Sequence, residues 1–150
     1  MEAKAYLTFV LGNEKFAISV DRVQEVVEFE KVTKVPNAPD YMLGIINLRG
    51  RLLPLLDTKM KLGLPKTEIT RKSRIMVLLI PGIDEKQMEI GALVDLAREV
   101  VEIREDETQA APEFENYSTN APISRILNKQ GEVTMLMDIE KVFSSQDLTL

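Results

Sequence analysis

The sequence predicts an all-β fold built from two similar small units, and three observations support this prediction. Short stretches of alternating apolar and polar residues recur along the 150 residues, each bounded by turn-forming residues. No stretch carries the apolar spacing of a long amphipathic helix. The chain also repeats two of its segments in the same order. Together these features favour a sandwich or barrel of short strands joined by tight turns.

The first predicted strands form a hairpin. Apolar and polar side chains alternate over residues 7–20, and the alternation is interrupted by the turn-forming residues 12–15. Asp21 then stands where it could cap a short helix, in which the valines of residues 23–27 would share one face. Because β-branched valines also suit strands, an extended segment is the alternative.

The stretch GIINLRGRLLPLLD, residues 44–57, predicts a second hairpin. Two apolar runs flank Arg49 and Arg51, and Gly50 between them supplies the positive φ that a tight turn requires. Pro54 has no N–H to donate to a neighbouring strand, so we expect it at an edge or a bulge.

The remaining elements follow from similar signals. Asp57 is expected to cap a short turn or helix, and residues 74–80, which are apolar on both faces, form a buried strand. Residues 104–122 are polar and contain prolines, which predicts a long, mobile loop. A last strand pair closes around residues 130–131, and a helical turn over residues 138–143 follows.

Two segments of the chain recur. Residues 16–29 align with residues 90–103 at a shift of 74, and residues 50–62 align with residues 131–143 at a shift of 81. Units of this size bury only a marginal core alone, so we expect the two to share an apolar seam. A chance likeness between valine-rich strands and glycine turns is the alternative.

The amino-acid composition argues against several classes of functional site. Cysteine and histidine are both absent, which removes disulfides, thiolate metal sites and the usual bases of nucleophilic catalysis. A net charge of −5 disfavours a surface that neutralises phosphates. No apolar run approaches the roughly 18–20 residues of a membrane helix, and the N-terminus lacks the apolar segment of a signal peptide. We therefore expect a cytoplasmic protein that is not inserted into a membrane and carries no cofactor or metal.

Two groups of charged residues leave alternative functions open. Asp57 and Asp138 could be the paired carboxylates of an enzyme, although each follows an apolar strand, where a helix cap belongs. The basic residues between Lys66 and Arg74 could bind nucleic acid. Glu68 interrupts that cluster, however, and no aromatic residues interleave with it, which favours a solvated connector.

Two further groups could bind a partner protein. Val20 and Val23, followed by Glu25, fit either the core or the centre of an interface. Arg49 and Arg51 fit either a solvated turn or a rigidly held guanidinium that binds a carboxylate or carbonyl of a partner.

Longer motifs extend over residues 5–143. They are the opening YLTFVLGNEKFAISVDRVQEVVE, then YMLGIINLRGRLLPLLDTKMKLG with its GxxNLRG pattern, and later IGALVDLAREVVEI, APEF and MDIEKVF. With these motifs the chain resembles the CheW-like family, the adaptors of bacterial chemotaxis. The resemblance implies a single CheW-like domain over residues 1–150. It also implies an all-β fold of two SH3-like five-stranded β-barrel subdomains that share a hydrophobic core, with short helical turns.

The resemblance also implies a function. Such an adaptor is a non-catalytic scaffold that couples methyl-accepting chemoreceptors to the histidine kinase CheA, whose regulatory domain it binds. It would be cytoplasmic and recruited to receptor arrays at the membrane, with no nucleic acid among its partners. A small β-barrel protein that binds nucleic acid is the alternative.

The family's binding positions can be carried over to this chain. The positions implied to bind the kinase are Leu7, Val20, Val23 and Glu25. The positions implied to bind the receptor are Gly44, Asn47, Arg49, Gly50, Val94 and Leu96. Arg51 lies outside the motif, and we expect it to be a solvated strand residue. Arg125 stands near a position where the family often has glycine.

Overall fold

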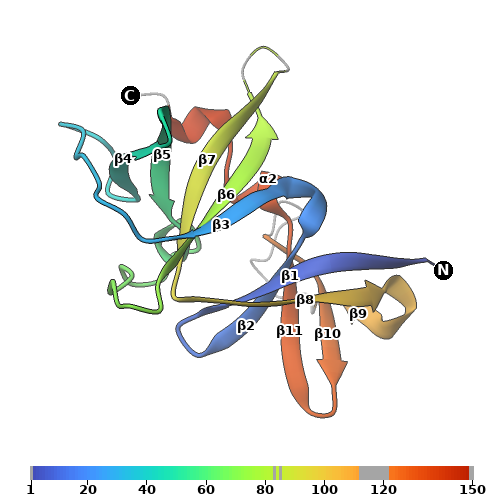
Figure 1. Ribbon diagram of the computed structural model, residues 1–150. Coiled ribbons are helices and arrows are strands. Elements are labelled where there is room, and N and C mark those ends of the chain that lie inside the picture. Colours follow the sequence, from blue (N-terminus) through green and yellow to red (C-terminus); the bar gives the residue numbers. More distant parts are fainter. Residues whose placement is uncertain (1, 83, 85, 112–121, 149–150) are drawn as a thin grey trace.

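A computed structural model describes residues 2–82, 84, 86–111 and 122–148. These residues form eleven strands in two hydrogen-bonded sheets, with only short helical turns between them (Figure 1). Sheet A has six strands in the order β8-β1-β2-β11-β10-β9, and sheet B has five in the order β3-β6-β7-β5-β4. The predicted all-β class is confirmed.

The chain forms its elements in two similar series. The first series comprises β1 (Ala3–Leu11), β2 (Glu14–Ser19), the 3₁₀ turn η1 (Val20–Arg22), β3 (Val23–Glu28), β4 (Met42–Leu48), β5 (Arg51–Asp57) and α1 (Thr58–Lys61). The second comprises β6 (Arg74–Pro81), β7 (Gln87–Val94), β8 (Leu96–Arg104), η2 (Glu105–Glu107), β9 (Thr108–Ala110), β10 (Ile123–Lys129), β11 (Glu132–Met137), α2 (Ile139–Val142) and η3 (Ser145–Leu148).

The chain crosses between the two sheets twice. The chain leaves sheet A after β2 and enters sheet B as β3, which pairs with β6. It leaves sheet B after β7 and returns to sheet A as β8, which pairs with β1 (Figure 1). Both sheets therefore contain strands from both halves of the sequence.

The strand registers place the repeated segments at equivalent positions. Leu55 of β5 lies opposite Gly91 of β7 in a parallel pair, and Leu136 of β11 lies opposite Ala17 of β2 in another. The sequence shifts of 81 and 74 relate these two pairs to each other. The repeat is therefore a repeat of structure, with β2 equivalent to β7, β3 to β8 and β5 to β11.

The apolar seam predicted between the two units is present. One buried cluster takes side chains from both sheets, among them Phe9 and Ile18 of sheet A and Met76 and Val94 of sheet B. The rings of Phe9 and Phe16 stack within it, with centroids 5.8 Å apart. A second cluster, which includes Ile46, Leu53 and Ile75, lies within sheet B and supports the β4–β5 hairpin. The two sheets do not close into barrels, and sheet A has six strands where five were expected, whereas sheet B has five.

The prediction of a helix after Asp21 is wrong. Only η1 is helical, and its cap is Ser19, whose hydroxyl accepts a hydrogen bond from the Asp21 N–H at 3.3 Å. The valines that follow belong to β3, where inward and exposed residues alternate. The extended alternative prevails because pairing with β6 satisfies the backbone and suits β-branched side chains.

The prediction that Pro54 lies at an edge or a bulge is confirmed. Pro54 lies in β5 at a point where the strand pairs with β4 alone, since the ladder to β7 begins at Leu55. Pro54 is thus locally at an edge, as a residue without an N–H requires.

The loop predicted over residues 104–122 instead forms η2 and β9 in its first part. Its second part, residues 112–121, lies outside the described residues.

Candidate protein-interaction site

The β4–β5 hairpin ends in a two-residue turn. Leu48 pairs with Arg51, which leaves Arg49 and Gly50 as the turn, with φ angles of 52° and 87°. Two successive positive φ angles define a type I′ turn, whose twist matches that of the flanking strands. The side-chain oxygen of Asn47 accepts a hydrogen bond from the Gly50 N–H at 2.8 Å and so fixes the turn. Gly50 has the conformation that the sequence predicted.

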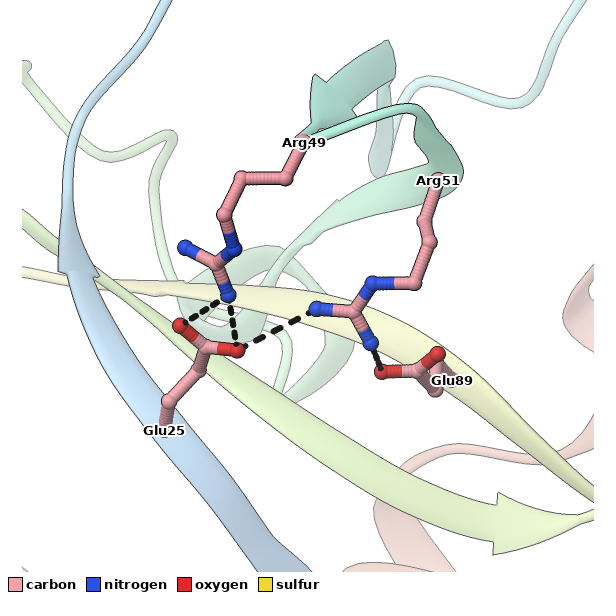
Figure 2. Close-up of polar contacts among 4 residues, drawn as sticks. All are labelled: Glu25, Arg49, Arg51 and Glu89. Atoms are coloured by element: carbon pink, nitrogen blue, oxygen red, sulfur yellow. Dashed lines mark hydrogen bonds and ion pairs between the residues drawn. The ribbon is translucent and has the colours of Figure 1, made fainter.

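Four charged side chains meet beside this turn and form the Arg49 tetrad, namely Glu25, Arg49, Arg51 and Glu89 (Figure 2). The Arg49 Nη2 group donates to both carboxylate oxygens of Glu25, at 2.6 and 2.8 Å. Arg51 donates to Glu25 through Nη2 at 3.2 Å and to Glu89 through Nη1. Arg51 was predicted to be a solvated strand residue, and its side chain is 40% exposed, but it also lies between two carboxylates, which the sequence did not predict.

The tetrad links β3 to two strands that are not its neighbours in sheet B. Glu25 comes from β3, Glu89 from β7 and Arg51 from β5, whereas β6 lies between β3 and β7. In Figure 2 the two arginines reach from the turn towards carboxylates on β3 and β7. The ion pairs thus fasten the turn over the sheet, and Arg49 can be presented with little freedom left to lose.

Arg49 remains the most open member of the tetrad. Its side chain is 64% exposed, compared with 40% for Arg51 and 28% for Glu25. Among the described residues, its hydrogen bonds and ion pair are with Glu25 alone, and all of them use Nη2. The Nε–H and the second amino group of this guanidinium are therefore available to an acceptor on another molecule.

The ion pairs shift the protonation of their members. The hydrogen bond from Arg49 is the main cause that lowers the pKa of Glu25 below its ordinary value of 4.5. Partial burial opposes this shift, and the charge of Arg49 and the contact with Arg51 add to it. The hydrogen bond to Glu25 raises the pKa of Arg49. Both groups are charged at neutral pH.

These directions predict an acid-sensitive contribution to stability. A carboxylate whose pKa is lower in the folded state stabilises the fold above its unfolded pKa, and this contribution disappears as the pH falls through the folded pKa. We expect Glu25→Gln to unfold more easily than the parent at pH 7, and this difference to shrink as the pH falls below 4.5. Urea titrations of both proteins at several pH values measure it. Glu28→Gln removes an exposed carboxylate from the same strand and is the control. A difference that stays constant down to the most acid pH would contradict the expectation.

Gly44 and Asn47, two positions implied to bind the receptor, have structural roles in the hairpin. Gly44 is buried with φ of 145°, and a Cβ atom there would lie 2.2 Å from the carbonyl oxygen of Thr33. That close approach belongs to the bridge between Thr33 and Ile45, which covers part of β4. Asn47 is an exposed residue of β4, but its side-chain oxygen already accepts the hydrogen bond from the Gly50 N–H.

The positions implied to bind the kinase differ in how much they are exposed. Val20 and Val23 are half-buried and pack against the core cluster that also contains Leu7, which is 6% exposed. Glu25 belongs to the tetrad and contacts Arg49, a residue implied to bind the receptor. The structure therefore connects the two sets through one ion pair.

Val94 and Leu96 lie at the crossing from sheet B to sheet A. Val94 ends β7 and has no exposed surface, so its side chain belongs to the core. Leu96 begins β8, pairs with Val10 and is half-buried. Both positions stay predictions as binding residues.

The two aspartates considered as a catalytic pair are helix caps. Asp57 accepts hydrogen bonds from the backbone of Lys59 and Met60, and Asp138 accepts one from Glu140. Asp57 has no exposed surface, and Thr67 binds both of its oxygens, at 2.7 and 2.9 Å. Its carboxylate is therefore closed to a substrate. Within the described ranges, no group of three or more acidic residues converges in a geometry that could hold a metal ion.

The basic cluster of residues 66–74 is a connector anchored by its own backbone. Arg74 Nη1 donates to the carbonyl oxygens of Arg71 and Ser73, at 2.8 and 2.9 Å. Arg71 and Lys72 are exposed, and Arg71 lines a cavity together with Phe29 and Ile69. This segment shares no contact with the tetrad in the part of the chain that the structure describes.

Sequence reasoning missed one residue of the tetrad. Glu89 is a lone charge within the apolar stretch of β7, between Met88 and Ile90. Its partner Arg51 lies 38 positions earlier in the chain, and only the pairing of β5 with β7 brings the two together. An unpaired acid in an otherwise apolar strand was the only signal of a partner across the sheet.

Known proteins resemble this chain in sequence and structure. It is 31% identical to "Chemotaxis protein CheW" of Bacillus subtilis over 93% of this chain and 86% of that protein, and 29% identical to the protein of the same name from Klebsiella aerogenes over 97% and 84%. The crystal structure of the scaffolding protein TtCheW from Thermoanaerobacter tengcongensis superposes with a TM-score of 0.81 at 28% identity. The match covers 95% of this chain and 94% of that one, and it confirms the SH3-like fold.

No described helix has the length and apolarity to span a membrane. The sequence model of the CheW-like domain matches residues 5–147, so the chain belongs to the CheW-like family.

Proposed function

We propose that this chain is a non-catalytic adaptor that couples methyl-accepting chemoreceptors to the histidine kinase CheA. Its relatives are named chemotaxis proteins, and the solved relative is named a scaffolding protein. The carboxylate pair that the sequence offered for catalysis, Asp57 and Asp138, includes a residue, Asp57, that is enclosed by hydrogen bonds. A scaffold needs surfaces rather than a reaction centre, and the tetrad provides such a surface.

The observation that carries the proposal is the presentation of Arg49. Its guanidinium is fixed by Glu25 on one side and open on the other, at the end of a rigid turn. A fixed guanidinium with free N–H groups binds a carboxylate or carbonyl at a low cost in side-chain entropy. We assign this surface to the receptor.

The kinase would bind at the half-buried valines of η1 and the start of β3. Val20 and Val23 lie over the shared core, with Leu7 beneath them. An interface centre combines apolar anchors with a polar rim, and Arg22 and Glu140 supply a charged pair nearby, joined at 2.5 Å. Because Glu25 contacts Arg49, the two proposed surfaces are adjacent.

The strand exchange supports a further part of the proposal. Since β3 and β8 each pair with strands of the other half, neither half can form its sheet alone. We infer that the chain acts as one CheW-like domain and meets its membrane-bound receptors from the cytoplasm.

Arg49→Ala is expected to weaken receptor binding by about tenfold or more, the effect of losing a buried arginine contact at an interface centre. Arg51→Ala is expected to weaken it by about threefold at most, because Arg51 already has two carboxylate partners. Isothermal titration calorimetry with a soluble cytoplasmic fragment of a methyl-accepting receptor from the same genome measures both. Melting temperatures should agree within a few degrees. Equal losses in the two variants, or unfolding of Arg49→Ala alone, would return Arg49 to a structural role.

A further inference from the structure

We propose that Glu89 is a specificity-determining residue of the β4–β5 hairpin, because it holds Arg51 and so leaves Arg49 as the cation that an acidic group of the receptor binds. This inference rests on the proposed function of the hairpin. It concerns a residue outside the sequence motifs that carried the resemblance.

The geometry divides the tetrad into two pairs. Arg49 donates only to Glu25, whereas Arg51 makes its closest contact with Glu89 and a longer one, at 3.2 Å, with Glu25. Glu89 is the least exposed of the four side chains, at 22%. A partly buried carboxylate on a central strand is a fixed anchor, and it draws the Arg51 guanidinium away from the tip of the turn.

Loss of the Glu89 charge would change which arginine is available. Two guanidinium groups would then share the single carboxylate of Glu25, and the local charge would rise from zero to one positive charge. Arg49 and Arg51 flank Gly50, so both could reach the same acceptor on a partner. Binding would become less dependent on Arg49 and more dependent on total charge.

The repeat offers an internal comparison. The positions equivalent to Arg51 and Glu89 are Glu132 and Lys15, which also pair with each other, at 3.2 Å and with the charges reversed. The turn residue equivalent to Arg49 is the neutral Gln130, with φ of 54°. Each sheet thus holds an ion pair beneath its hairpin turn, but only sheet B combines that pair with a turn cation.

The test is a double-mutant cycle with the same receptor fragment. Arg49→Ala is titrated in the parent and in Glu89→Gln, where the expected loss falls from about tenfold to about threefold or less, because Arg51 substitutes for Arg49. Glu89→Asp keeps the charge and should retain the larger loss. Removing the competing cation with Arg51→Ala in the Glu89→Gln protein should restore it. Glu28→Gln, which changes the net charge equally on β3, should leave the Arg49→Ala loss unchanged.

The outcomes separate the two levels of inference. An equal loss from Arg49→Ala with and without Glu89 overturns the role of Glu89 and leaves the receptor surface standing. No loss from Arg49→Ala in the parent overturns both. If Glu89→Gln fails to fold, Glu89→Met, which also removes the charge from β7, takes its place in the cycle and should likewise lower the loss from Arg49→Ala to about threefold or less. An unchanged loss in that variant overturns the role of Glu89.

Discussion

Asp57→Ala is expected to lower the free energy of unfolding by about 3–5 kcal/mol, among the largest losses from a single side chain in this protein. The Asp57 carboxylate has no exposed surface and accepts hydrogen bonds from α1 and from Thr67 in the connector. Truncation would leave the Thr67 N–H and hydroxyl without partners in a buried place. Urea denaturation at pH 7 measures the loss.

Asp138→Ala is the matched control for Asp57→Ala. Asp138 occupies the equivalent position in the repeat and caps α2, but among the described residues its side chain makes one hydrogen bond, the cap bond from the Glu140 N–H at 3.1 Å. Loss of an ordinary cap costs about 1 kcal/mol. Equal losses at the two positions would show that the Thr67 contacts contribute nothing to the stability of the fold.

Gly44→Ala is expected to destabilise the protein by at least about 3 kcal/mol, or to prevent folding. The residue adopts φ of 145°, and a Cβ atom would lie 2.2 Å from the Thr33 carbonyl oxygen and 2.7 Å from a methyl group of Val32. The strain of that backbone conformation alone is about 1–3 kcal/mol for a residue with a side chain, and displacement of the Thr33 backbone adds to it. Thermal and urea unfolding measure the loss.

Gly12→Ala separates backbone strain from close approach. Gly12 also has a positive φ, of 62°, but a Cβ atom there meets nothing within 4 Å. We expect a loss of about 1 kcal/mol from strain alone. If Gly44→Ala were as stable as Gly12→Ala yet failed to bind the receptor, Gly44 would be a contact residue rather than a structural one.

The features that depend on neighbouring residues could be predicted from the sequence. Gly50 stands in its turn with a positive φ, and Asp57 and Asp138 cap short helices, because these roles need only the adjacent backbone. The repeat also revealed that Asp57 and Asp138 occupy equivalent places. Its registers confirm the shared seam, since equivalent strands enter the same core cluster.

The features that depend on distant strands could not be predicted from the sequence. The valines after Asp21 favoured a short helix, with an extended segment as the alternative, and it is pairing with β6 that makes them a strand. Gly44 is constrained by Thr33, eleven residues earlier in the chain. The β-bridge between Thr33 and Ile45 brings them together, and no pattern of apolar residues predicts that bridge. Arg51 was expected in solvent because Glu89 reaches it only across the parallel pairing of β5 and β7.

Co-sedimentation of receptor and kinase tests the adaptor role most directly. Membranes that carry a methyl-accepting receptor are mixed with CheA from the same genome, with and without this chain, and the kinase in the pellet is measured. The adaptor role predicts that the kinase sediments with the receptor only when the chain is present, and that Arg49→Ala abolishes most of this effect while the chain still binds the kinase in solution. Equal sedimentation of the kinase without the chain, or a chain that binds neither partner, would contradict it.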